Sequence, residues 1–232
     1  MKWQFDKEGF FFSLGLIIFV FFSILTVKIY ADFYADVFLS PELRVFERNL
    51  ASLPSLIKEA ERIKLAFVGD IMLDRGPELR VNKLAGGDYR FPFLLIADQI
   101  SKYDFLFGNL EGPMSDVGRD SGSFISFRFD EKATQGLLYA GFDALSVANN
   151  HSGDWGRAAF EDTIVNLETA KIAPVGDSLQ PKIVEVGGLK IALVAFADFP
   201  GPGMRATDEN IIEALDNSRL KADLIVASCH FG

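Results

Sequence analysis

Cysteine and histidine are scarce in this sequence, and their scarcity narrows the chemistry that it can support. The chain of 232 residues holds one cysteine, Cys229, and two histidines, His151 and His230. A single cysteine excludes a disulfide within the chain. Because Cys229 ends an apolar run that starts at Leu224, we expect a buried core thiol and not a nucleophile.

Basic residues are also in the minority. The chain has 23 lysines and arginines against 32 aspartates and glutamates, which gives a formal net charge of -9. A protein that binds a phosphate backbone needs a basic face, and no basic stripe is present. We therefore expect no nucleic acid among the partners. The acidity would suit a domain that binds cations, although solubility explains it equally well.

One long apolar run, residues 10–27, carries no charge and is followed by Lys28. About 20 residues cross a bilayer core, so this run and its neighbours suffice for a membrane anchor over residues 1–31. A buried core helix or a cleaved signal peptide is the alternative, but no small-x-small cleavage site follows the run. Lys2 and Lys7 weakly favour a cytoplasmic N-terminus. We expect a single-pass protein of the cell membrane whose soluble domain lies outside the cytoplasm.

The remainder of the chain is expected to divide into a helical connector, residues 32–62, and a domain, residues 63–232. In the domain, short apolar runs without alternation suit strands that are buried on both faces. These runs are Leu65–Val68, Phe105–Phe107, Ala144–Ala148, Ile191–Phe196 and Leu224–Ser228. Helical stretches are predicted over Phe93–Ile100, Glu131–Ala140, Arg157–Ala170 and Asn210–Leu220.

This alternation predicts an α/β domain with a largely parallel sheet and helices on its faces. One exception is Val186-Gly187-Gly188-Leu189, which joins two apolar runs and predicts a two-residue hairpin. The sheet is therefore expected to be mixed.

Polar side chains follow the predicted strands where ligands bind in open α/β sheets, beyond the carboxyl ends. They are Asp70, Asn109 with Glu111, Asn149 to His151, Asp198 and His230. A single aspartate at such a place is usually a helix cap, but five strand ends of this kind are harder to explain as caps. Carboxylate, carboxamide and imidazole together suit a divalent ion such as Mn²⁺, Fe²⁺ or Zn²⁺. Such an ion could lower the pKa of a coordinated water and supply hydroxide, and His151 could protonate a leaving group.

Four segments carry a resemblance to a known family. They are Gly69-Asp70-Ile71-Met72-Leu73, Asn109-Leu110-Glu111-Gly112-Pro113, Ala148-Asn149-Asn150-His151 with Asp154 and Gly156, and His230-Phe231-Gly232. In this order and spacing they resemble the CapA (PgsA-type) poly-γ-glutamate capsule synthesis family over residues 62–232. That family is similar in fold to calcineurin-like metallophosphoesterases. Its members commonly begin with a membrane anchor and act outside the cytoplasm.

The resemblance implies a role for each matching residue. Asp70 matches the first metal-binding aspartate, and Glu111 stands where a bridging carboxylate is expected, with Asn109 as a further candidate ligand. Asn150 matches the metal-binding asparagine, His151 the neighbouring catalytic histidine, and His230 a later histidine ligand.

Three other residues are given weaker roles. Arg75 is a candidate contact for an anion, but a plain surface arginine is an equal alternative. Asp154 is expected to cap the helix that starts near Gly156 and not to bind metal. Asp198 is left outside the site.

Two departures from the family pattern affect the site. Metallophosphoesterases usually carry Asp-x-His at the first strand, and Met72 stands in place of that histidine. The family also continues into a Gly-His-x-His motif, whereas this sequence stops at Gly232. We expect a partial domain with an incomplete metal site.

Three functions stay open on the sequence alone. The first is a membrane-anchored role in the synthesis or export of poly-γ-glutamate or a similar surface polymer, with other membrane proteins and the lipid bilayer as partners. The second is a metal-dependent phosphoesterase or hydrolase with His151 as general acid. In the third, the polar residues cap helices and bind nothing.

Overall fold

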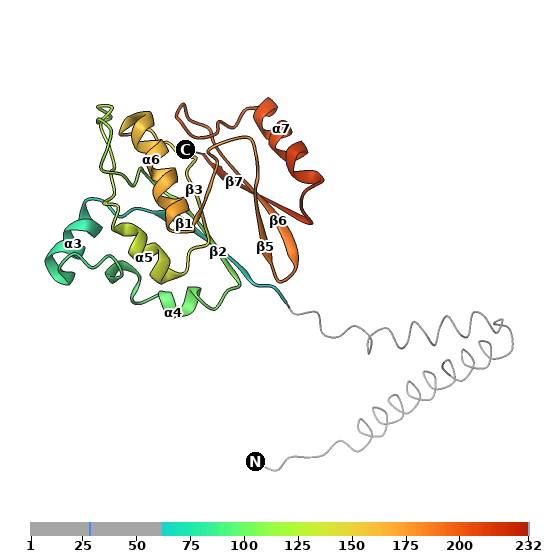
Figure 1. The fold of residues 1–232 in the computed structure, drawn as a ribbon, viewed down its shortest axis with the longest axis horizontal. Coiled ribbons are helices and arrows are strands. Elements are labelled where there is room, and N and C mark those ends of the chain that lie inside the picture. The colour runs from blue at the N-terminus through green and yellow to red at the C-terminus, as the bar shows by residue number, and fades with distance from the viewer. Residues whose placement is uncertain (1–27, 29–61, 232) are drawn as a thin grey trace, which may run out of the picture. The chain divides into compact units, whose positions relative to one another are not determined.

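Two β-sheets lie at the centre of the computed structural model, which describes Lys28 and residues 62–231 (Figure 1). The first sheet has the strand order β1-β2-β3-β4 and the second has the order β5-β6-β7. The strands are β1 (Leu65–Ile71), β2 (Phe105–Leu110), β3 (Ala144–Ser146), β4 (Ala173–Val175), β5 (Lys182–Val186), β6 (Leu189–Ala197) and β7 (Leu224–His230). The helices are α3 (Gly76–Ala85), the 3₁₀-helix η1 (Phe91–Phe93), α4 (Ala97–Ile100), α5 (Ala133–Ala140), α6 (Gly156–Thr169) and α7 (Asp208–Arg219).

The predicted class, a mixed and largely parallel α/β arrangement, is confirmed. All strand pairs of the first sheet are parallel, and so is the pair of β6 and β7. The predicted hairpin is also present, because β5 and β6 are antiparallel and Val186 pairs with Leu189 across the turn. The structure divides the strands between two sheets, however, where a single sheet was expected.

The side chains of β2 and β6 explain the two sheets. On β2, Phe105 and Phe107 pack into a core shared with the second sheet, whereas Leu106 packs among the helices on the other side. On β6, Ile191 packs into the shared core and Phe196 packs beside α7. Because successive side chains of a strand point to opposite faces, each of these strands is covered on both sides, which accounts for their continuous apolar runs.

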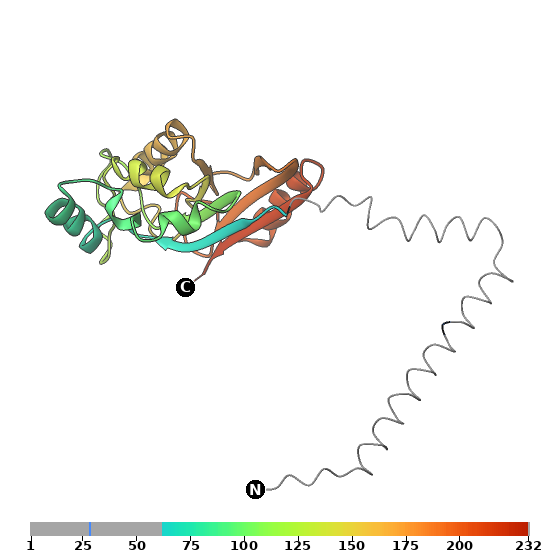
Figure 2. The same ribbon diagram turned by 90° about the horizontal axis from the view of Figure 1, so that it is seen from below.

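The domain is therefore layered, with helices outside and the two sheets inside. Figures 1 and 2 show α5 and α6 over the first sheet and α7 over the second. The helical core includes Val81, Phe93, Leu137 and Phe160, and the core between the sheets includes Val175. The carboxyl ends of β1, β2 and β7 lie at one edge, where the candidate site forms.

Several elements differ from the expected ones. Helix α3 was not predicted, because Val81 is its one buried residue and its apolar pattern is weak. Strand β4 was not predicted because it is short and contains Pro174. The helix expected over Phe93–Ile100 is instead η1, a turn and α4, since the exposed Leu94 and Leu95 give it no amphipathic face.

Cys229 is exposed, although a buried thiol was expected. Among the described strands β7 lies at the edge of its sheet, and Cys229, which pairs with Phe196 of β6, is on the face toward α7 but stays exposed at that edge. Partial burial still raises the pKa of the Cys229 thiol, which disfavours the nucleophilic thiolate at neutral pH.

The predicted anchor and connector, residues 1–31 and 32–62, lie almost entirely outside the described residues. Within the part of the chain that the structure describes, no helix is long and apolar enough to cross a membrane.

Candidate metal centre

Asp70 reaches the centre because strand β1 is irregular where it carries this residue. β1 pairs regularly with β2 from Leu65 to Phe67, and the register then shifts before Asp70 pairs with Asn109. A β-bulge bends a strand and redirects its side chains, and bulges are common beside functional sites. Asp70 therefore lies level with Asn109 on the neighbouring strand.

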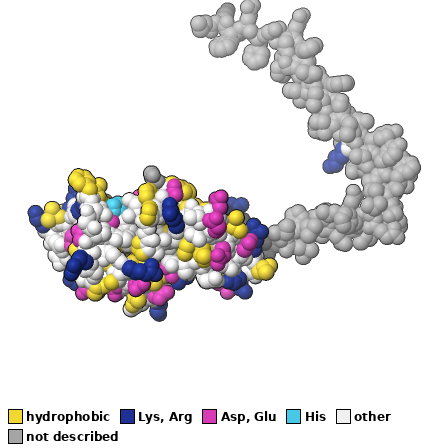
Figure 3. All heavy atoms as spheres, turned by 90° about the horizontal axis from the view of Figure 1, so that it is seen from above, with side chains coloured by type: hydrophobic (Ala, Val, Ile, Leu, Met, Phe, Trp, Pro, Cys, Tyr) yellow, Lys and Arg dark blue, Asp and Glu magenta, His cyan; other side chains and the backbone are white. Residues whose placement is uncertain are grey.

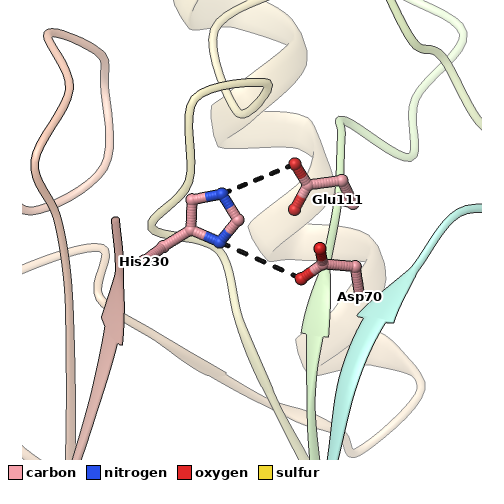
Figure 4. Close-up of side chains that lie close together, drawn as sticks. All are labelled: Asp70, Glu111 and His230. Carbon is pink, nitrogen blue, oxygen red and sulfur yellow. Dashed lines mark ion pairs between the residues drawn. The ribbon is translucent and has the colours of Figure 1, made fainter. Parts of the chain in front are cut away.

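Two carboxylates and one imidazole meet at this edge, although they come from both sheets (Figure 4). His230 Nδ1 lies 3.9 Å from Asp70 Oδ1, and His230 Nε2 lies 3.7 Å from Glu111 Oε1. One ligand atom from each residue lies within 4.8 Å of the other two. Ligand atoms around one ion are roughly 3–4 Å apart when each bond is about 2 Å long, so small side-chain shifts would bring these three groups onto a common ion.

Asn109 lies between the carboxylates and presents its amide nitrogen to them. Its Nδ2 donates to Asp70 Oδ1 at 2.8 Å and to Glu111 Oε2 at 2.5 Å, and lies 3.4 Å from His230 Nδ1. An amide NH₂ has donors only and cannot bind a metal. In this orientation Asn109 holds the two carboxylates together by hydrogen bonds and does not itself offer a ligand atom.

Asn149 fixes the orientation of the Asn109 amide. The sequence shows Asn149 in the segment Ala148-Asn149-Asn150-His151 but predicts no role for it. Asn149 Nδ2 donates to Asn109 Oδ1 at 3.0 Å and to the Leu110 carbonyl at 2.7 Å. Asn149 Oδ1 accepts from the His151 backbone N–H at 3.1 Å. Asn149 is 2 % exposed as a residue and uses both ends of its side-chain amide inside the protein.

Asn150 and His151 extend the centre beyond β3. Asn150 Oδ1 lies 2.8 Å from His230 Nε2, which places a carboxamide oxygen beside the imidazole. His151 Nδ1 lies 2.8 Å from Asp154 Oδ2, and no hydrogen bond to another residue of 62–231 occupies His151 Nε2.

Asp154 is not the helix cap that the sequence predicted. The N-cap of α6 is Trp155, and no side-chain hydrogen bond caps this helix. The Asp154 carboxylate instead accepts from His151 and from the Phe127 backbone N–H at 2.8 Å. The sequence spacing of Asp154 from His151 could have suggested the first contact, but the contact with Phe127 depends on tertiary packing.

Burial raises the pKa of Glu111, and the nearby Asp70 carboxylate raises it further, while His230 and the Asn109 amide act in the opposite direction. A carboxylate in these surroundings is stabilised by a positive charge. The site nevertheless opens to solvent, because the Asp70 side chain is 57 % exposed. In the space-filling view, histidine atoms reach a surface on which acidic and basic side chains are interspersed (Figure 3).

The remaining predicted residues occupy different places. Asp198 is exposed and meets His230 through backbone atoms, its N–H donating to the His230 carbonyl at 3.0 Å. Arg75 is exposed, and its guanidinium lies 4.9 Å from the centre of the Phe127 ring. That ring lies 4.3 Å from the His151 ring, so Arg75 belongs to the surroundings of the site.

Residues 64–232 match the family model for the bacterial capsule synthesis protein PGA_cap. The chain belongs to this family. The resemblance carried by the four motifs is thereby confirmed at the level of the family, and all the residues of the candidate centre lie within the matched part.

Two curated relatives show how far this similarity extends. The chain is 29% identical to the capsule biosynthesis protein CapA of Bacillus anthracis over 212 residues, which cover 80% of the chain and 50% of the relative. It is 25% identical to the PGA biosynthesis protein CapA of Bacillus subtilis (strain 168) over 234 residues, which cover 93% of the chain and 58% of the relative. The chain thus spans about half the length of the curated relatives that it matches.

Proposed function

We propose that this protein takes part in the synthesis or export of a surface polymer of the poly-γ-glutamate type, through a domain that holds a divalent metal ion. The observation that carries the proposal is the meeting of Asp70, Glu111 and His230 at the carboxyl ends of strands from two sheets. Family membership and the names of the two CapA relatives support the polymer.

The donor set fits a divalent ion such as Mn²⁺, Fe²⁺ or Zn²⁺. Two carboxylates and an imidazole would bind it directly, and Asn150 is placed to add a carboxamide oxygen beside His230. When bound, such an ion would lower the pKa of a coordinated water and neutralise negative charge on an oxyanion. Asn109 and Asn149 would keep the two acidic ligands in place.

A gene deletion with complementation tests the role in the polymer. We expect deletion to remove surface polymer and the wild-type gene to restore it. Asp70→Ala should fail to restore it, whereas Asp98→Ala, which removes an exposed carboxylate on α4, should succeed. Undiminished polymer after deletion would contradict the role, and full restoration by Asp70→Ala would contradict the need for the metal centre.

The contact between His151 and Asp154 favours a second function, metal-dependent hydrolysis of a phosphoester. Asp154 orients the His151 ring, so a proton on Nε2 faces away from the carboxylate. In hydrolysis, a water oxygen would form the new bond to phosphorus and lose its proton to solvent, while the ester P–O bond breaks. His151 would then give its Nε2 proton to the leaving oxygen.

Turnover of phenyl phosphate with added Mn²⁺ tests this second function, because its leaving phenolate is basic enough to need a proton from His151. His151→Ala should lower the rate by roughly 100-fold or more, since general acid catalysis contributes about 10²–10⁴-fold. Asn150→Ala should also lower it by weakening metal binding. Equal turnover by the wild type and Asn150→Ala would rule out this site as its source.

We propose in addition that residues 10–27 anchor the protein in the cell membrane and that the domain acts outside the cytoplasm, beside other membrane proteins of a polymer synthesis or export complex. The apolar run supports the anchor. Membrane fractionation of the full chain and of a chain without residues 1–31 would test it.

A further inference from the structure

Arg75 has a backbone conformation that side chains rarely adopt. Its φ is 54° and its ψ is -111°, and it is the residue before helix α3. The other non-glycine residue with positive φ in the described part of the chain is Lys171. Lys171 follows the end of α6, where the bonds from Lys171 N to Glu168 O and from Ile172 N to Leu167 O form the usual left-handed helix ending.

Helix formation gives no such reason for Arg75, because residues before a helix normally have extended backbone. Strained backbone persists where the surrounding structure enforces it, and it is concentrated at functional sites. Here the Arg75 N–H donates to Asp74 Oδ1 at 2.5 Å, and Asp74 Oδ2 accepts from the Arg128 N–H at 3.0 Å. Asp74 therefore ties the loop after β1 to the segment that contains Phe127.

That segment is tied in turn to the candidate centre. Asp154 Oδ2 accepts from both the Phe127 N–H and His151 Nδ1, and the Phe127 and His151 rings lie 4.3 Å apart. The backbone that follows Glu111 also lies close to Phe127. Gly112 has φ 150°, and a Cβ placed there would lie 3.0 Å from Phe127 Cβ. Phe127 thus packs between the Arg75 guanidinium and the centre.

The Arg75 guanidinium forms no ion pair with a carboxylate among residues 62–231. It differs in this from Arg90 and Arg157, which form ion pairs with Asp88 and Glu161. Its one side-chain hydrogen bond within that range is long, 3.4 Å from Nη2 to the Ser126 carbonyl. A planar guanidinium with free donors is suited to carboxylate and phosphate groups, which it can bind through two parallel hydrogen bonds.

We propose that Arg75 binds an anionic group of the substrate beside the metal centre, and that this group is an oxyanion, either a carboxylate or a phosphate. Phe127 holds the guanidinium by a cation–π contact and sets its distance from His151. The proposal rests on the proposed function for the identity of the reacting centre. It adds the residue that holds the anionic group of that substrate.

Titration of the full chain with methylphosphonate and with glutarate tests this proposal and separates the two anions. Binding is followed by calorimetry on the Mn²⁺-loaded protein and by the His151 ring resonances of the metal-free protein, which has two histidines in all. The probe that binds with the lower Kd shows whether Arg75 prefers a phosphate-like group or a carboxylate. Arg75→Ala should weaken binding by about tenfold or more, the size of one charge-assisted hydrogen-bonding pair, and Arg75→Lys by a smaller factor.

Arg75→Gly separates this role from folding. Glycine adopts positive φ without strain, so this variant should fold at least as well as the wild type and still lose the anion. Arg80→Ala removes an exposed arginine of α3 and should bind both probes as the wild type does. Equal probe affinity of Arg75→Gly and the wild type, or binding of neither probe by the wild type, would overturn the role of Arg75. Absence of Mn²⁺ binding would overturn the metal centre alone, because the histidine resonances report on the anion without the ion.

Discussion

Asn149 donates a hydrogen bond to Asn109, and this contact turns the Asn109 amide so that its nitrogen faces Asp70 and Glu111. Two negatively charged groups close together repel each other, and the shared donor offsets part of that repulsion. The Asn149 side chain is buried and fully used, which makes it a structural requirement of the acidic pair.

We expect Asn149→Ala to lower the free energy of unfolding by about 1–3 kcal/mol, because it leaves the Asn109 oxygen and the Leu110 carbonyl buried without a donor. Urea denaturation of the metal-free domain measures the change. Asn150→Ala, at the exposed neighbouring position, should cost less than about 0.5 kcal/mol. Similar losses for the two variants would show that the Asn149 network contributes no special stability.

A second prediction concerns pH. The pKa of Glu111 is raised in the folded protein above the ordinary value of 4.5, chiefly by burial. A raised folded-state pKa gives stability that is fully present below pH 4.5 and is lost as the pH rises through the folded-state value. As the pH rises through this range, the melting temperature of the metal-free wild type should therefore fall relative to that of Glu111→Gln. Melting curves of both proteins from pH 4 to about 8 measure it, and parallel curves would contradict the prediction.

A third prediction tests the packing of α5. A Cβ added to Gly136 would lie 2.1 Å from the Tyr89 carbonyl oxygen, a backbone atom that cannot move aside by rotation. Alanine gains about 1 kcal/mol in helix propensity, but overpacking costs about 1–3 kcal/mol or more. Gly136→Ala should therefore be destabilising in thermal unfolding. Gly76→Ala, where the added Cβ meets no atom within 4 Å, is the control and should not be.

The fourth prediction concerns Cys229, which is exposed but has a raised thiol pKa. Since the thiolate is the reactive form, iodoacetamide should label this residue completely but more slowly than it labels glutathione at pH 7, and the rate should increase with pH. Mass spectrometry follows the single thiol of the chain. Resistance to labelling in the native protein would mean that Cys229 is covered.

Much of the fold could be read from the sequence because the central strands are buried on both faces. The continuous apolar runs Phe105–Phe107 of β2 and Ile191–Phe196 of β6 reflect that burial. The hairpin was equally readable, since Gly187 and Gly188 at its turn both have positive φ. The division into two sheets was not, because it depends on which strands pair, and Phe105 and Ile191 look alike whether they lie in one sheet or in two facing sheets.

The ligand positions of the candidate site could be predicted from the sequence, but the contacts that orient them could not. The positions of Asp70, Glu111 and His230 at or just beyond predicted strand ends made them candidate ligands, and the structure brings these three residues together. The orientation of Asn109 and the use of Asp154 by Phe127 could not be read from the sequence, because both depend on contacts between segments distant along the chain. The bulge before Asp70 leaves no mark in the apolar pattern that would distinguish it from a regular strand end.

The position of His230 on β7, the last described strand, has a consequence for how the protein matures. Asp70 and Glu111 leave the ribosome well before His230, so a nascent chain can offer two acidic ligands but not the imidazole. A divalent ion that is bound by all three would bind only after β7 has joined β6, and its binding energy would then favour the pairing of these two strands. Metal binding would in that case depend on β1, β2 and β7 together, and it would report that the two sheets have come into contact.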